Sequence, residues 1–197
     1  MPLMAQPELL DEIPAFLRPL TVAGPITAAA MVTSVDGRAT VGGRVGDLTG
    51  RADQQILLGA REHAAAVVVG GNTVHNEGYD GLLGDDAKAR REARGLPPEP
   101  ELVVFTRASP SPPDLWQQLR KRYPDQLIVC EGGPTVLGLI IEHGLLDQLV
   151  LSVSPRIVGG DTEKRLVEHA APLDVRLELL GLAAVEGFLF VRYGLER

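Results

Sequence analysis

The stretch Leu127–Thr135, LIVCEGGPT, decides the fold because it joins a strand, a glycine turn and a helix start. Its first four residues are apolar, which predicts a buried parallel strand. Gly132 and Gly133 follow at the carboxyl end of that strand, and Pro134 is suited to the first helical position. The apolar residues after Pro134 predict a helix that packs against a sheet.

A glycine turn that leads into a helix is a favourable place for an anion. The exposed backbone N–H groups and the positive end of the helix attract a phosphate, so Gly132, Gly133, Pro134 and Thr135 are candidate cofactor residues. Glu131 precedes the turn, and its carboxylate would repel a phosphate unless it faces another part of the ligand. The stretch therefore predicts a cleft with a phosphate-bearing cofactor on one side and a polar substrate on the other.

The segment VVVGGNT at 67–73 repeats this arrangement, because a buried strand meets two glycines and then two residues that can cap a helix. Taken alone, it is equally well explained as a tight structural turn. Two such turns in one sheet favour a ligand, since ligands bind outside the carboxyl ends of parallel strands. Gly71 and Thr73 are accordingly candidate cofactor residues. Neither turn reads G-x-G-x-x-G and the chain has no P-loop motif, which excludes the standard dinucleotide and P-loop sites.

Strand and helix patterns alternate along the chain, which predicts an α/β fold with a mainly parallel sheet between helices. The expected strands are 26–32, 38–41, 64–69, 102–105, 127–130 and 148–153, followed by an antiparallel hairpin of 176–182 and 187–193. The expected helices are a short one on the outside within 1–20, then 51–63, 85–95, 114–123 capped by Asp114, and 135–143. We take residues 1–24 as an N-terminal extension and residues 25–197 as a single domain.

Composition narrows the function classes. The net charge of −7 argues against non-specific binding to nucleic acid or to an anionic membrane. No apolar run approaches the roughly 18 residues of a membrane span, and the acidic, proline-containing start does not resemble a signal peptide. The single cysteine, Cys130, excludes an internal disulfide and is expected to pack as a small apolar residue. We therefore expect a cytoplasmic protein that acts on a small molecule.

Other candidate site residues lie near predicted strand ends. Thr106 and Arg107 could hold a 2′-phosphate, because a guanidinium offers a fork of donors, although a solvated loop explains them equally well. Glu77 follows the second glycine turn. Asp36 either completes a simple turn with its following glycine or orients a substrate. The four histidines show no metal-ligand spacing, and no G-x-S-x-G elbow occurs, so neither a metal site nor an α/β-hydrolase is expected.

Four segments together resemble one known family: MVTSVDGRAT at 31–40, VVVGGNTVHNEGY at 67–79, LIVCEGGPTVLGLIIEHGLLDQLVLSVSPRIVGG at 127–160 and FLFVRYG at 188–194. They resemble the reductase domain of the bifunctional riboflavin-biosynthesis deaminase/reductase, which has a dihydrofolate-reductase-like fold. The zinc signature of the deaminase half, H-x-E with P-C-x-x-C, is absent, so only the reductase half is expected.

The resemblance implies reduction of the ribosylamino side chain of 5-amino-6-(5-phosphoribosylamino)uracil to ribitylamino by NADPH. It implies that Thr73 and Glu77 contact the cofactor and that Gly132, Gly133, Pro134 and Thr135 hold its phosphates. It also implies that Arg61 and Glu131 contact the substrate. Asp36, Glu131 and water are the candidates for protonating the product.

The sequence departs from the family pattern in three places. Glu77 stands where an aspartate is common, EGYDGLLGDD at 77–86 lacks the arginine that binds the substrate's phosphate, and GDLTG at 46–50 lacks the serine and tryptophan of S-x-W-I-T. Two alternatives therefore remain open: a reductase of dihydrofolate, another pterin or another small molecule, and a non-catalytic NADP-binding module. The family also implies a homodimer, which we expect at the apolar closing hairpin.

Overall fold

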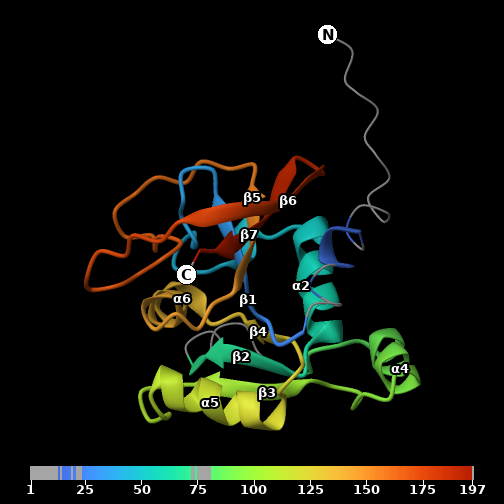
Figure 1. Cartoon of the computed structure of the whole chain (residues 1–197). Coiled ribbons are helices and arrows are strands. Elements are labelled where there is room, and N and C mark those ends of the chain that lie inside the picture. Colours follow the sequence, from blue (N-terminus) through green and yellow to red (C-terminus); the bar gives the residue numbers. More distant parts are fainter. Residues whose placement is uncertain are drawn as a thin grey trace.

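The computed structural model describes residues 13, 15–18, 20, 24–71, 74 and 81–196. These residues build a seven-stranded sheet in the order β3-β2-β4-β1-β5-β7-β6 (Figure 1). The strands are β1 Thr27–Ser34, β2 Ala66–Gly70, β3 Glu101–Phe105, β4 Ile128–Cys130, β5 Gln148–Ser154, β6 Leu177–Val185 and β7 Phe188–Leu195. The first five strands of the sheet order are parallel, and β7 and β6 close the sheet as an antiparallel hairpin.

Helices cover both faces of the sheet. They are α2 Arg51–His63, α4 Asp85–Ala93, α5 Pro112–Arg122 and α6 Gly133–Glu142, with a short 3-10 turn η1 at Gly46–Leu48. Alternate residues of β2 point to opposite faces, as a pleated strand requires. Val67 and Val69 pack with Ile56 of α2, whereas Val68 packs with Trp116 of α5 and Ile140 of α6. The result is a three-layer fold with the sheet in the middle, which confirms the predicted fold class.

The segment before β1 contributes to the core. Residues 15–18 are helical and lie beside α2, outside the sheet as expected (Figure 1). The side chains of Ile13, Phe16, Leu17 and Leu20 are nevertheless buried in the layer that α2 forms with the sheet. A Cβ at Gly59 of α2 would lie 2.5 Å from Cδ1 of Leu17, so a glycine at this position permits the close approach. These four residues of the segment are therefore part of the hydrophobic core.

Three local predictions were wrong. The predicted strand 38–41 is a loop that makes only single bridges, because glycines 42 and 43 adopt positive φ and turn the chain back after Val41. Helix α5 is capped by Ser111, whose Oγ accepts a hydrogen bond from the backbone N–H of Asp114 at 3.4 Å. Gly133 takes the first position of α6 and Pro134 the second.

No helix in the described part of the chain combines the length and the hydropathy that a membrane crossing needs.

Arg91 joins α4 to the end of α2. Its side chain is buried, and its guanidinium donates hydrogen bonds of 2.8 Å to the backbone carbonyls of Glu62, Ala64 and Pro97. Carbonyls at a helix C-terminus lack intrahelical partners, so Arg91 satisfies groups that would otherwise be buried without a donor. We expect Arg91→Met to lower the free energy of unfolding by about 1–3 kcal/mol in urea denaturation. Arg94→Met, at an exposed position, is the control, and an equal effect of both changes would contradict this role.

Candidate functional site

Two glycine turns and the end of β3 meet at one edge of the sheet. Gly70 at the end of β2 pairs in register with Phe105 of β3, and Val68 of β2 pairs with Cys130 of β4. Because these strands are parallel, the residues that follow them emerge side by side. A Cβ added to Gly71 would lie 3.1 Å from Cγ2 of Thr106, which shows how closely the two chain segments approach. The predicted meeting of the two turns is confirmed by this geometry.

The turn between β4 and α6 requires glycine. Gly133 has a φ of +37° and donates its N–H to the carbonyl of Glu131 at 3.0 Å. A Cβ at Gly132 would lie 2.8 Å from Cβ of Val136, a distance that real side chains do not adopt. The N-cap residue of α6 makes no side-chain hydrogen bond, and Thr135 in the first turn is exposed. The start of α6 therefore offers a positive dipole end and the backbone N–H of Thr135 to an anion, whereas Pro134 has no N–H and that of Gly133 is already bonded.

The structure describes only some of the remaining candidate cofactor residues. Thr106 and Arg107 are exposed at the end of β3, beside Gly71. The hydroxyl of Thr106 accepts a hydrogen bond from the N–H of Ala108 at 3.2 Å and so shapes the loop. Thr73 and Glu77 lie outside the described residues. The structure thus brings Gly71 and Thr106 together and places Arg107 and the start of α6 on the same edge of the sheet.

A pocket of about 310 Å³ adjoins this edge, between β1, α2, β5 and the turn that leads into α6. The polar side chains in its wall are Thr49, Asp53, Arg61, Glu131 and Ser152. The apolar wall includes Ala30, Val32, Ile56, Leu57 and Val150. Gly133 and Pro134 line the same pocket, so a ligand inside it would lie beside the first turn of α6.

Arg61 and Glu131 form a bidentate ion pair in this pocket. The Nε and Nη2 atoms of Arg61 donate to the two carboxylate oxygens of Glu131 at 2.7 and 2.6 Å. Both side chains are largely buried, with exposed fractions of 12% and 5%. The positive charge of Arg61 offsets the carboxylate of Glu131 next to the glycine turn, so Glu131 is compatible with a candidate phosphate site there. Both residues line the pocket, and their contact with a substrate stays a prediction.

Asp36 lies outside this pocket lining. Its carboxylate accepts hydrogen bonds from the hydroxyl of Ser34 at 2.6 Å and from the backbone N–H groups of Val158 and Gly159 at 3.0 and 2.7 Å. The Ser34 hydroxyl, followed by the two backbone donors, holds the pKa of Asp36 well below its usual range. Asp36 thus fastens the loop after β5 to the turn after β1, and it is not among the residues that line the pocket with Arg61 and Glu131.

Nothing in the sequence pattern singled out Asp53 or Ser152, although both line the pocket. An aspartate in the first turn of a helix is ordinary, because the helix dipole favours it there. A signal was nevertheless present in the spacing of Asp53 from the candidate residue Arg61. Asp53, Leu57 and Arg61 are four residues apart, so their side chains share one face of α2. Burial raises the pKa of Asp53, and a hydrogen bond with Ser152 partly opposes that effect.

Two other candidate chemistries find no support. Cys130 is buried, and burial raises the pKa of its thiol to about 12, so a reactive thiolate is not formed near neutral pH. Among the described residues, no group of three or more histidine, cysteine or acidic side chains could hold a metal ion.

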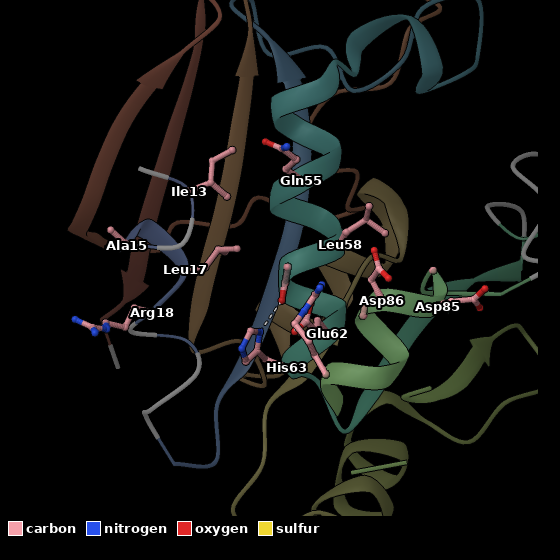
Figure 2. A pocket seen from close by; sticks show the side chains of 14 residues that line it. Ile13, Ala15, Leu17, Arg18, Gln55, Leu58, Glu62, His63, Asp85 and Asp86 are labelled. Atoms are coloured by element: carbon pink, nitrogen blue, oxygen red, sulfur yellow. Dashed lines mark hydrogen bonds and ion pairs between the residues drawn. The ribbon is translucent and has the colours of Figure 1, made fainter. Parts of the chain in front are cut away.

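A larger and more open groove of about 1030 Å³ lies on the outer side of α2, next to the start of α4 and the segment 13–18 (Figure 2). Two of its ionisable residues, His63 and Glu62, are engaged with neighbours. His63 bonds to the carbonyl of Gly59 at 2.9 Å, and Glu62 pairs with Arg90 and Arg94 at 2.7 and 2.9 Å. The groove includes none of the residues of the glycine turns, so the smaller pocket is the candidate site.

The family model of the RibD C-terminal domain matches residues 25–118 and 104–188. The chain belongs to the RibD C-terminal domain family. Membership supports a reductase of the riboflavin-biosynthesis type, and the matched residues include both glycine turns and the pocket. No curated protein is significantly similar in sequence to this family member.

Solved structures share the fold of this RibD C-terminal domain. A pyrimidine reductase-like protein from Corynebacterium diphtheriae has a TM-score of 0.80 at 21% identity, over 96% of this chain and 99% of that chain. The riboflavin biosynthesis reductase Rib7 of Saccharomyces cerevisiae has a TM-score of 0.65 at 14% identity, over 94% and 100%. For Acinetobacter baumannii RibD the values are 0.63 and 18%, and the match covers 95% of this chain but only 62% of that chain.

Proposed function

We propose that this protein is an NADPH-dependent reductase that converts the ribosylamino side chain of 5-amino-6-(5-phosphoribosylamino)uracil to ribitylamino. The observation that carries the proposal is the juxtaposition of the uncapped start of α6 with a pocket that contains the Arg61–Glu131 pair. The first feature suits a cofactor phosphate and the second suits a polar substrate. Membership of the family supports the same activity.

The cofactor would occupy the edge where β2, β3 and β4 end. The turn formed by Gly132, Gly133, Pro134 and Thr135 would hold its phosphates through the dipole of α6 and the backbone N–H of Thr135, since Pro134 has no N–H and that of Gly133 is bonded to the carbonyl of Glu131. Gly71, Thr73 and Glu77 would contact it at the second turn, and Thr106 with Arg107 would bind the 2′-phosphate that distinguishes NADPH from NADH. When bound, the nicotinamide supplies the hydride, and the protein supplies orientation.

The substrate would occupy the pocket beside Gly133. Glu131 accepts hydrogen bonds from Arg61 at both carboxylate oxygens, which fixes the orientation of its carboxylate in the wall. We infer that this pair orients the substrate and that water from the open side protonates the product. Asp36 would act indirectly, by holding the loop 157–159 in place.

A pterin such as dihydrofolate is the second candidate substrate. Arg61 is the only basic residue among the described residues of the pocket wall, and it is already bound to Glu131. The segment 72–80 adds no lysine or arginine. A substrate without a phosphate would therefore suit the pocket, whereas the phosphoribosyl substrate must find its phosphate contact elsewhere.

The test is NADPH oxidation, measured as loss of nicotinamide absorbance, with the ribosylaminouracil phosphate and separately with dihydrofolate. Turnover of the uracil compound supports the first proposal. Turnover of dihydrofolate alone replaces it by a pterin reductase. Tight NADPH binding without oxidation by either compound would instead favour the third possibility, a non-catalytic NADP-binding module.

We further propose a homodimer formed through β6. This strand is the edge of the sheet, and Leu177, Leu179 and Leu182 on it are exposed. Apolar edge strands present unpaired backbone groups and favour pairing with another strand. We expect Leu182→Lys to shift the protein from dimer to monomer in sedimentation velocity, and Leu58→Lys on the exposed side of α2 to leave the dimer intact. A monomeric native protein would contradict the proposal.

A further inference from the structure

The segment 163–169, which follows β5, connects two parts of the pocket wall without lining the pocket itself. It runs beside the loop after β1 (Figure 1), where the backbone N–H of Ala39 donates a hydrogen bond of 2.8 Å to the carbonyl of Lys164. Further along, the N–H of Glu168 donates one of 3.1 Å to the carbonyl of Pro134. Ala39 and Pro134 both line the pocket, so the distance between these parts of the wall depends on the segment.

Glu163 fastens this segment to the loop after β1. Its carboxylate accepts a hydrogen bond from the hydroxyl of Thr40 at 2.6 Å, and two from the backbone N–H groups of Gly42 and Gly43 at 2.8 and 3.3 Å. Both glycines have positive φ, of +57° and +76°, and successive N–H groups in a turn form a concave anion site. Val45, which follows this turn, lines the pocket. The carboxylate of Glu163 therefore fixes the part of the chain that leads into the wall.

The other end of the segment packs on α6. A Cβ at Gly138 of α6 would lie 2.8 Å from the carbonyl oxygen of Glu168, so the helix and the segment are in direct contact. Nε2 of His169 lies 3.1 Å from Oε2 of Glu142, the last residue of α6. The segment is thus attached to the helix whose first turn borders the pocket, and Glu163 links the loop after β1 to it.

The three hydrogen bonds of Glu163 are charge-assisted. The hydroxyl of Thr40, followed by the backbone N–H of Gly43, holds the pKa of Glu163 below its usual range, so the carboxylate is ionised at neutral pH. Hydrogen bonds to an ionised group are roughly twice as strong as those between neutral groups. They join residues that are 120 to 123 positions apart, so they fix the tertiary position of the loop after β1.

We propose that Glu163 is a positioning residue for the substrate, because it holds the wall at Ala39 and Val45 at a fixed distance from Pro134. The inference rests on the proposed function, since it places the substrate in this pocket. Glu163 does not line the pocket, so it acts on the substrate only through the loop after β1. The ends of β2, β3 and β4 are held by the sheet, so cofactor binding should not depend on Glu163.

The experiment measures substrate binding and turnover in Glu163→Ala. Calorimetric titration in the presence of NADP⁺ gives the affinity for the ribosylaminouracil phosphate and for dihydrofolate without turnover, and NADPH oxidation gives KM and kcat. For the compound that the native protein binds, we expect the dissociation constant and the KM to rise about five- to tenfold. The kcat should stay within about twofold, because a displaced wall weakens ground-state and transition-state binding alike. Affinity for NADPH should be unchanged.

Asp161→Ala is the matched control. Asp161 is an exposed acid two positions before Glu163, and it makes no hydrogen bond or ion pair with the described residues. Its replacement removes the same charge from the same loop and should leave the KM, the kcat and both affinities unchanged.

Thr40→Val tests the link from its other side. Thr40 is buried, and its hydroxyl donates to Glu163 and accepts from the backbone N–H of Lys164 at 3.0 Å. The change should raise the KM in the same direction as Glu163→Ala. The double variant should be no worse than about the larger single effect, because both changes break one link. Independent, multiplying effects would contradict an action of Glu163 through this loop.

The outcomes separate this inference from the proposed function. Unchanged substrate affinity in Glu163→Ala, or an equal loss in Asp161→Ala, would overturn the role of Glu163 and leave the reductase assignment standing. A fall in kcat without a rise in KM would also overturn it. A native protein that binds neither compound would overturn the proposed function and this inference with it.

Discussion

Replacing Arg61 with methionine is expected to lower the free energy of unfolding by about 3–5 kcal/mol, because the change leaves Glu131 as an uncompensated buried charge. The two side chains are held at 2.6 and 2.7 Å in a largely buried site, so solvent can replace Arg61 only poorly. For a protein of this size such a loss corresponds to a decrease in melting temperature of roughly 10 °C.

The double variant Arg61→Met with Glu131→Met separates the charge effect from lost packing. Replacement of both partners by apolar groups removes the unpaired charge, so most of the stability should return. Calorimetric melting of the native protein, the single variant and the double variant measures the coupling between the two sites. Equal destabilisation of the single and the double variant would mean that the ion pair itself is not what the single change disrupts. Both variants should lose reductase activity.

Thr135→Asp is expected to weaken NADPH binding about tenfold to a hundredfold, from the repulsion between the new carboxylate and a phosphate a few ångströms away. Thr135 is exposed in the first turn of α6, so the change causes no steric clash. An acid in the first turn of a helix also interacts favourably with the helix dipole. The affinity for NADPH should therefore fall while the melting temperature stays constant or rises. A variant that lost affinity because it misfolded would instead have a lower melting temperature.

Thr135→Asn is the matched control for shape, because it lacks only the charge. It should retain NADPH affinity within about threefold. The loss in Thr135→Asp should diminish at high salt, since exposed charges are screened beyond about 10 Å at 0.1 M ionic strength. Unchanged affinity of Thr135→Asp would place the cofactor phosphates away from α6.

The sequence predicted the fold well because its signals are local and repeated. The bounds of helix 51–63 agree with α2, and every strand of the parallel core was placed within a few residues. The meeting of the turns after β2 and β4 followed from topology alone, because parallel strands end on the same edge. Arg61 and Glu131 were expected to contact the substrate, and both line one pocket, but their bond to each other could not be deduced from residues 70 positions apart.

What the sequence missed depends on tertiary contacts. Asp53 has the sequence pattern of a helix-start acid, and only the approach of Ser152 on β5 shows that it is buried in a pocket. Asp36 had a turn pattern, and its partners Val158 and Gly159 lie more than 120 residues away. The stretch 38–41 has strand-like composition, but it follows one turn and precedes another, so it lacks a neighbour to pair with over its length.

The most direct measurement is an equilibrium titration of the native protein with NADPH and with NADH, followed by nicotinamide fluorescence. The cofactor edge at the ends of β2, β3 and β4 predicts saturable binding of one NADPH per chain, in the micromolar to millimolar range usual for enzyme ligands. It also predicts NADPH affinity about tenfold or more above that for NADH, because the 2′-phosphate adds a charge-assisted contact to Arg107. Absence of saturable binding for both nucleotides would contradict the assignment of this edge to a nicotinamide cofactor.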